Sequence, residues 1–392
     1  MNRRHTVPFV IVLVIAMVVS TFQLFVIAVL AAEIIDEFDV TKWQIGILGA
    51  ANTGVGALLA PWLGRVTDRV GARNATGLVF ATSGLGMIVT AAAGTYALLV
   101  LGSLISGVPQ GWSNAATNKL ISARTGLKSS GLITGFKQSG VQLGSFIAGL
   151  VMPAIAVNFD WHAGLVGIGV ATLLAGGITM WVLVPDQLLA HRSRSVSSAT
   201  RLPPFVFQVA VYALFVGLAA GGVGRFIPLF ANEKLGFSLQ GAGIVFAFQG
   251  ALGIVARLMW GRATESRLPL RGSLLAMALG GAGVFVLLLL ATSIGGWILW
   301  PIAALMAFTT SAWNVVAMLA VIRSVPVADA GRATGVVMMA FLGGLTISGP
   351  AVGWSIDRTG GYSQAWWGLL ILVLIGALSV SRDFGAGKST FG

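Results

Sequence analysis

The sequence predicts an all-α membrane protein with twelve transmembrane helices, arranged as two parallel six-helix pseudo-repeats. Three observations predict this fold class: the chain is very apolar, its apolar runs have the length of membrane spans, and its second half repeats residues of its first. Of the 392 residues, 56% are hydrophobic and only 9% are charged, and the mean hydropathy is +0.91. A soluble globular surface needs more charged groups, so we expect the chain to lie in a bilayer.

The apolar runs fit helices that cross a membrane. A hydrocarbon core about 30 Å thick needs about 20 apolar residues per helix, and the runs lack the alternation of barrel strands. The predicted spans are 7–32, 43–63, 74–93, 96–121, 131–157, 161–184, 205–231, 238–260, 272–292, 295–322, 333–355 and 362–380. The first run is too long for the core of a signal peptide, so we expect the first helix to be retained.

Basic residues alternate from loop to loop. The amino terminus and every second loop hold most of the 24 Lys and Arg residues, whereas the loops between them hold Lys42, Lys234 and Arg358. By the positive-inside rule, this asymmetry places both termini in the cytoplasm of a multi-pass cell-membrane protein, with a bacterial inner membrane as the expected location. The net charge of +12 therefore reflects topology and attraction to lipid headgroups, and we expect no nucleic-acid partner.

The two halves of the chain carry matching residues. The aligned pairs include Gly64 and Gly261, Arg65 and Arg262, Thr67 and Thr264, Asp68 and Glu265, and Asn114 and Asn314. We therefore expect two six-helix bundles, at 1–184 and 205–392, joined by a cytoplasmic linker at 185–204 that is rich in Ser, Arg and Pro. Parallel repeats predict a substrate site between the halves, near the middle of the membrane.

A charged, glycine-containing stretch lies in the predicted loop after the second span. Its sequence is Gly64-Arg-Val-Thr-Asp68-Arg69-Val-Gly71-Ala-Arg73. It resembles the signature Gly-x-x-x-Asp-Arg-x-Gly-Arg-Arg/Lys of the major facilitator superfamily, with Ala72 as the departure. The resemblance covers essentially the whole chain and implies the major facilitator fold. It also implies a conformational latch in which Asp68 contacts neighbouring helix ends, helix 11 among them, with Glu265 at the equivalent place.

Polar side chains inside the predicted spans are costly unless they face a cavity or a partner. Predicted helices 3, 6, 9 and 12 carry few of them, which matches the lipid-facing helices of that family. The other helices carry Gln23, Asn52, Gln110, Asn114, Gln138, Gln142, Gln249 and Asn314. These amides can bind substrate or tie helices together. Trp112 and Trp313, beside the two asparagines of the repeat, can wall a substrate site or anchor the interface.

Four cations fall within the spans: Lys119, Lys137, Arg225 and Arg257. The 12 acids lie in loops or at helix ends, so no deep carboxylate neutralises these cations, and an unpaired buried charge is costly. We expect Lys119 to extend its ammonium group toward the nearby helix end. We expect Lys137 and Arg257 to bind an anion in the cavity, whereas Arg225 fits either a cavity or an interfacial position.

The stretch Arg257-Leu-Met-Trp-Gly261 is similar to the Arg-x-x-x-Gly stretch of helix 8 in monocarboxylate porters and oxalate/formate antiporters. That resemblance implies that Arg257 binds a substrate carboxylate, for which a planar guanidinium is suited. Helix 11 departs from these antiporters, because Val337 and Met338 stand where a lysine is expected. In helix 4, Gly107 replaces the arginine of the family's Arg-x-x-Gln-Gly, which is associated with proton coupling.

Together these residues predict a secondary transporter of a small organic anion, with a carboxylate favoured, working by alternating access as a monomer. Protons or a counter-anion are the expected coupling partners. Cysteine is absent and the three histidines are scattered, and nucleotide-binding and nucleophile motifs are missing, so we expect no metal, no cofactor and no enzyme activity. Two alternatives stay open: a drug exporter of the same fold, which normally uses a membrane-embedded acid, and a transporter-like membrane sensor.

Overall fold

The protein is helical throughout the part that its structure, a computed structural model, describes: residues 3–124, 127–183, 202–266, 269–326 and 329–381. The first half contains α1 (Arg3–Val29), α2 (Ala31–Phe38), α3 (Lys42–Val70), α4 (Ala72–Ala91), α5 (Tyr96–Arg124), α6 (Leu127–Asn158) and α7 (Trp161–Val182). The second half contains α8 (Pro204–Leu235), α9 (Leu239–Ser266), α10 (Leu270–Ile294), η2 (Gly296–Ile298), α11 (Leu299–Phe308), α12 (Trp313–Ser324), α13 (Ala330–Thr359) and α14 (Ser363–Ser381).

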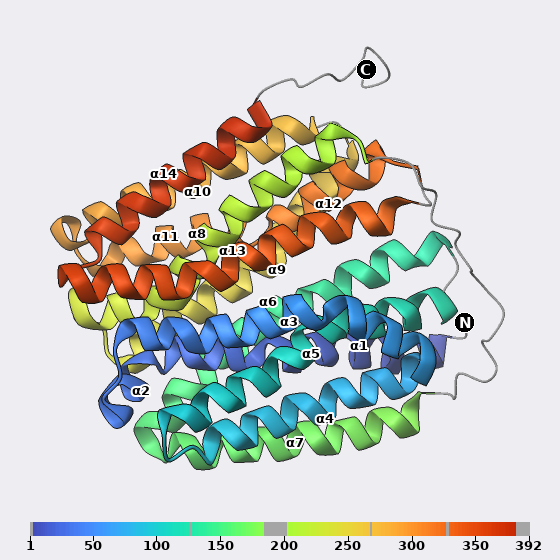
Figure 1. The fold of residues 1–392 in the computed structure, drawn as a ribbon, viewed down its shortest axis with the longest axis horizontal. Helices are drawn as coiled ribbons and strands as arrows, with labels where there is room; N and C mark the ends of the chain where they lie inside the picture. Colours follow the sequence, from blue (N-terminus) through green and yellow to red (C-terminus); the bar gives the residue numbers. More distant parts are fainter. Residues whose placement is uncertain (1–2, 125–126, 184–201, 267–268, 327–328, 382–392) are drawn as a thin grey trace.

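These helices confirm the predicted fold class. Eleven segments are long and apolar enough to cross a membrane, and α11 and α12 together form one of them. The predicted span that is not among these eleven is the fourth, 96–121, which is α5; this helix has 29 residues but carries Gln110, Ser113 and Asn114 near its centre. Figure 1 shows the two halves lying one above the other, with the beginning of α1 and the end of α14 at the same end. The predicted linker lies mostly outside the described residues, so the division of the chain at 184 and 205 stays a prediction.

Helix α3 is longer than its predicted span because the charged signature stretch is helical. It begins at a capping box, in which Thr41 Oγ1 accepts from the Gln44 N–H and the Gln44 side chain accepts from the Thr41 N–H at 2.8 Å. It ends at Gly71, whose φ of 85° suits glycine and lets α4 begin at once. The expected loop at 64–70 is therefore wrong, and these residues form the last turns of α3.

The predicted lipid-facing helices 3, 6, 9 and 12 are α4, α7, α10 and α14. They pack in lateral pairs, α4 with α7 and α10 with α14. Their outward faces carry large apolar side chains, among them Leu174 and Trp181 of α7, which are 65% and 88% exposed. Apolar exposure on this scale suits contact with lipid.

The two halves touch along α3 and α13 and along α6 and α9. We call the end where α1 begins and α14 ends the terminus end, and the opposite end the far end (Figure 1). Toward the far end, α3 and α13 pack so closely that a methyl group on Gly46 would overlap the Gly349 carbonyl. Toward the terminus end they separate, since Leu58 of α3 is 81% exposed and Met339 of α13 is 60% exposed.

Candidate functional site

A cavity of about 230 Å³ lies between the two halves, and α1, α5, α6, α8, α9, α11, α12 and α13 line it. Most of the residues predicted to bind substrate line this cavity: Gln110, Asn114, Gln138, Gln142, Arg225, Gln249, Arg257, Trp313 and Asn314. None of the described residues that line it is acidic. The fold therefore brings the predicted amides and two predicted cations to one place, and its net charge there is positive.

Arg257 of α9 reaches across the cavity to both halves. Its Nη1 donates to the Gln138 carbonyl of α6 at 2.6 Å, and its Nη2 donates to the Ser311 carbonyl at 3.2 Å. Its Nε is buried and has no hydrogen-bond partner in the described chain. Because both acceptors are neutral carbonyls, the guanidinium is held in place while its positive charge is left without a counterion.

Arg225 of α8 is more deeply buried, with 4% of its surface exposed. Its Nη1 is enclosed and lacks a hydrogen-bond partner, and no ion pair reaches this side chain within the described residues. An isolated charge out of water is strongly disfavoured unless something compensates it. The guanidinium lines the cavity, so an anion in the cavity can supply that compensation.

The amides of the cavity differ in how far they are satisfied. Gln138 Nε2 donates to Asn114 Oδ1 at 3.0 Å, and Gln249 Nε2 donates to Ser311 Oγ at 2.6 Å. The side-chain oxygens of Gln110 and Asn314 are buried without a partner among the described residues. Buried polar atoms are normally hydrogen-bonded, so these two amides are candidates to contact a ligand.

The tenth span is broken at residues 309–312, beside the cavity. Thr309 has φ −116° and ψ −86°, which end α11 before α12 begins. Side chains of α9 satisfy carbonyls at the break: Trp260 Nε1 donates to the Phe308 carbonyl at 2.8 Å, and the Ser311 carbonyl accepts from Arg257. Irregular backbone at membrane depth is tolerated where such partners exist. The sequence did not predict this break, because residues 302–322, which surround it, contain neither Gly nor Pro.

Most of the remaining cavity wall is apolar, and the sequence did not predict this part of the site. Met17 and Phe25 of α1, Phe246 of α9, Met306 of α11 and Phe341 of α13 all line the cavity. In an apolar span, such residues cannot be told from lipid-facing ones by type. The cavity therefore presents apolar surface as well as polar groups.

Lys137 is not among the cavity-lining residues, which corrects its expected position. Its side chain is fully buried, and its Nζ donates to Asn118 Oδ1 at 2.6 Å and to Asn114 Oδ1 at 3.1 Å. The two asparagines lie four residues apart on α5, so they present both oxygens on one face. Lys137 therefore links α6 to α5 through neutral amides.

Gln23, Asn52 and Trp112 also lie outside the cavity lining, because they tie helices of the first half together. Gln23 donates to Thr90 Oγ1 at 2.5 Å and accepts from Ser106 Oγ, Asn52 Nδ2 donates to the Ser103 carbonyl at 3.5 Å, and Trp112 Nε1 donates to Thr67 Oγ1 at 2.8 Å. These bonds join α1 to α4 and α5, and α3 to α5. Gln23 and Asn52 are thus in the second of their two predicted roles, whereas the link that Trp112 makes between helices was not predicted.

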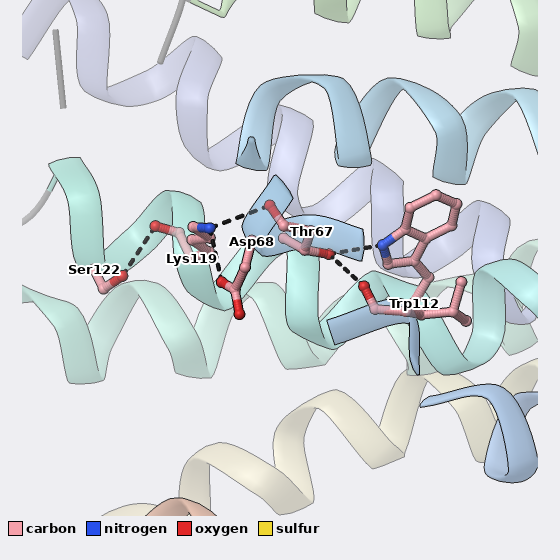
Figure 2. A network of polar contacts seen from close by, with 6 residues as sticks. Thr67, Asp68, Trp112, Lys119 and Ser122 are labelled. Atoms are coloured by element: carbon pink, nitrogen blue, oxygen red, sulfur yellow. Dashed lines mark hydrogen bonds and ion pairs between the residues drawn. The ribbon is translucent and has the colours of Figure 1, made fainter. Parts of the chain in front are cut away.

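The signature stretch makes contacts inside its own half. Figure 2 shows Lys119 of α5 beside the end of α3, with its Nζ 2.8 Å from Asp68 Oδ1 and 3.1 Å from the Thr67 carbonyl. The Asp68 side chain is 74% exposed. Lys119 thus has a carboxylate partner, where the sequence suggested only a cation reaching toward the helix end. The pair forms because α3 continues as a helix through Asp68 and runs beside α5.

The other predicted latch residues have separate roles. Arg69 is exposed, whereas Arg73 Nε donates to a backbone carbonyl of α7 at 3.0 Å and so ties α4 to α7. Gly71 forms the turn between α3 and α4, and a methyl group on Gly64 would meet nothing within 4 Å. The Glu265 side chain lies outside the described residues. The latch therefore stays a prediction.

Polar contacts also join the two halves at the far end, and the sequence did not predict them. Lys42 Nζ pairs with Glu233 at 3.0 Å, and the backbone N–H groups of Lys42 and Trp43 donate to the Asp357 carboxylate at 3.2 and 2.8 Å. A carboxylate at a helix N-terminus also meets the positive end of the helix dipole. Burial and then the Glu233 charge raise the pKa of Tyr362, whose hydroxyl donates to Glu233 at 2.9 Å. The partners are far apart in the chain, so local patterns cannot reveal them.

Comparison with known proteins agrees with this architecture. The model of the Major Facilitator Superfamily matches residues 13–346. The chain is 25% identical over 320 residues to the class D tetracycline resistance protein of Salmonella ordonez, which covers 78% of each chain. It also resembles solved structures of a bacterial homologue of the human lysosomal transporter Spinster, in inward-facing occupied and unoccupied conformations. The TM-scores are 0.76 and 0.78, with 16% identity and 97% of each chain covered.

The fold and the cavity between its halves define a multi-pass membrane transporter, not an enzyme. The chain belongs to the Major Facilitator Superfamily. The likeness to the Spinster homologue concerns the fold alone, because the sequences share few residues.

Proposed function

We propose that the chain is a secondary transporter of a small organic anion, with a carboxylate as the favoured substrate class. The observation that carries this proposal is the charge of the cavity: its lining includes Arg225 and Arg257, and none of the described lining residues is acidic. A guanidinium can donate two parallel hydrogen bonds to a carboxylate. Only an anionic substrate brings the counterion that these two side chains lack.

Transport would proceed by alternating access. The far-end contact and the separation of α3 and α13 at the terminus end support a state that is closed at the far end. The loop charges predict that both termini lie on the cytoplasmic side of a bacterial inner membrane. In that orientation, the cavity of this state would open to the cytoplasm. Asp68 would then contact α13 only when the terminus end closes, as the family's latch implies.

The coupling partner is a proton or a counter-anion. Proton coupling through the cavity needs a titratable group there, and the described lining holds neither an acid nor a histidine. Anion exchange needs no titration of the protein, so the lining favours a counter-anion. The proposed unit is a monomer surrounded by lipid.

A drug exporter is the second candidate function, and a relative favours it. The class D tetracycline resistance protein is 25% identical to this chain. The apolar wall formed by Met17, Phe25, Phe246, Met306 and Phe341 also suits lipophilic cargo. This candidate predicts cationic or neutral substrates, for which two unneutralised guanidiniums in the cavity are unfavourable.

Uptake into proteoliposomes separates the two candidates. We expect the purified protein to take up at least one of acetate, lactate, benzoate and succinate, and not tetraphenylphosphonium. The Arg257→Gln variant should lose this uptake, whereas Arg262→Gln, an exposed arginine on the same helix, should retain it. Uptake of the phosphonium or of tetracycline without uptake of any acid would reject the anion assignment.

A thermal-shift screen with the same acids provides a test of binding without flux. A ligand at about 100 times its Kd adds about 2.7 kcal/mol to the stability of the folded state. An acid that raises the melting temperature but is not transported would indicate a membrane sensor.

A further inference from the structure

We propose that Arg225 is a wedge between the two halves that keeps the far end from closing until an anion in the cavity neutralises it. The inference rests on the proposed function and extends it, because it makes closure of the far end depend on substrate. Its consequence is that the transporter exchanges anions much faster than it moves them in one direction.

The position of Arg225 is the first observation. Its guanidinium lies where α3 and α13 approach each other: a methyl group on Gly49 of α3 would overlap the guanidinium, and one on Gly349 of α13 would overlap its Nη1. Only glycine leaves room for this side chain on each of the two facing helices. The guanidinium of α8 is therefore enclosed by one residue from each half.

The absence of a counterion is the second observation. Arg225 is 4% exposed, and its Nη1 has no partner within the described chain. The two acids of the far-end contact are already engaged, Glu233 by Lys42 and Asp357 by the first turn of α3. The remaining accessible side of the guanidinium faces the cavity, where the described lining offers no carboxylate.

These observations link charge to closure. When α3 and α13 separate at the far end, water reaches the guanidinium and solvates it. When the helices close around it, that water is lost, and burying an uncompensated charge opposes closure. An anion bound in the cavity replaces the lost solvation, so the loaded transporter closes more readily than the empty one. A ligand shifts a conformational equilibrium only by such differential binding.

Double electron–electron resonance can measure far-end closure directly. The chain contains no cysteine, so spin labels can be placed at Thr95→Cys and Gln364→Cys without background. Both positions are exposed next to far-end helix termini, one in each half. The probe is whichever of acetate, lactate, benzoate and succinate most raises the melting temperature of the unlabelled wild-type protein.

We expect the probe to move the wild-type population toward the short distance. Arg225→Gln should give the short distance with or without probe, because no charge opposes closure. Gly349→Ala should favour the long distance in both conditions, because the methyl group displaces the guanidinium. Arg262→Gln, remote from the contact, should respond to the probe as wild type does. An Arg225→Gln protein that still needs the probe to close would overturn the inference.

Flux gives an independent readout. In wild-type proteoliposomes, exchange of the probe should exceed net efflux by at least about tenfold, which corresponds to a modest difference in closure free energy. In Arg225→Gln the ratio should fall toward one, even if both rates drop. A wild-type ratio near one with clear transport of the acid rejects the wedge and leaves the proposed function standing. If none of the four acids stabilises the wild type or is transported, the proposed function itself fails.

Discussion

The cations of the first half differ from those of the second half in what surrounds them. Lys119 pairs with Asp68, and Lys137 is held by two asparagine side chains, so each has partners from a helix of its own half. In the second half, Arg257 has only neutral carbonyls and Arg225 has no partner in the described chain. The amides do not divide in this way, because side-chain oxygens of both halves, those of Asn52, Gln110 and Asn314, are buried without a partner among the described residues.

This difference indicates that the cations of the two repeated halves have different roles. In the first half, the lysines Lys119 and Lys137 hold helices together, since each satisfied group removes a large desolvation cost. In the second half, the guanidinium groups of Arg225 and Arg257 have no counterion among the described residues, which leaves their charge available to a ligand. Polar character inside a span is therefore insufficient to mark a binding residue, and the state of its hydrogen bonds is the better guide.

The largest effect expected from this contrast concerns transport. The double variant Arg225→Gln and Arg257→Gln should lower the initial rate of anion uptake by more than about a hundredfold. Each hydrogen bond to a charged group is worth about 1.5–3 kcal/mol, and about 1.4 kcal/mol is a factor of ten. The matched double variant of the first half, Lys119→Gln with Lys137→Gln, should reduce uptake far less. Equal losses of uptake in the two double variants would show that the cations of the two halves do not differ in their role.

A smaller effect is expected on stability when the first-half lysine is removed. Lys137→Leu removes the donor to Asn118 Oδ1 and one of the two donors to Asn114 Oδ1, which should cost about 1–3 kcal/mol of unfolding free energy. Lys137→Gln retains a donor and should lose less. Thermal unfolding in detergent measures the change, and anion affinity should be almost unaffected. A large loss of anion affinity without a loss of stability would show that Lys137 binds the substrate after all.

The far-end contact should respond to the loss of its carboxylate. Asp357→Ala removes the acceptor of two N–H groups in the first turn of α3, and losing such a cap costs about 1–2 kcal/mol. We therefore expect the spin labels at the Thr95 and Gln364 positions to shift toward the longer distance. Asp36→Ala, which removes an exposed acid on α2, is the control and should leave the distances unchanged. An unchanged distribution in Asp357→Ala would show that other contacts hold the far end closed.

The smallest effect is expected at the signature stretch. The Lys119–Asp68 pair is largely exposed, and such surface pairs contribute less than about 1 kcal/mol. Lys119→Gln should therefore leave the melting temperature nearly unchanged. A drop as large as that of Lys137→Leu would show that the pair is a structural link and that the two lysines of this half act alike.

The fold was predictable because apolar length and loop charge are local properties of the sequence. The cavity residues of the second half were predictable for a related reason, since an arginine such as Arg257 inside an apolar run is costly wherever it points. Partners were harder to predict. In the sequence, Lys137 looks like Arg257, because each is a cation inside an apolar run. Only the packing of α5 against α6 gives Lys137 its two amide acceptors.

Two other features depend on distant parts of the chain. The far-end contact joins Lys42 to Glu233 and the start of α3 to Asp357, and no local pattern records such pairs. The signature stretch looked like a loop because of its charge and its glycines. It is helical because α3 continues alongside α5, where Lys119 accompanies its last turns.

The interruption of the tenth span has a mechanical consequence. Two of its carbonyls, those of Phe308 and Ser311, accept from Trp260 and Arg257, which both belong to α9. If α9 tilted alone, those carbonyls would be left bare in an apolar medium, at a cost of several kcal/mol each. The eighth span (α9) and the tenth span (α11 and α12) are thus coupled at this depth, and we expect them to move together as one unit.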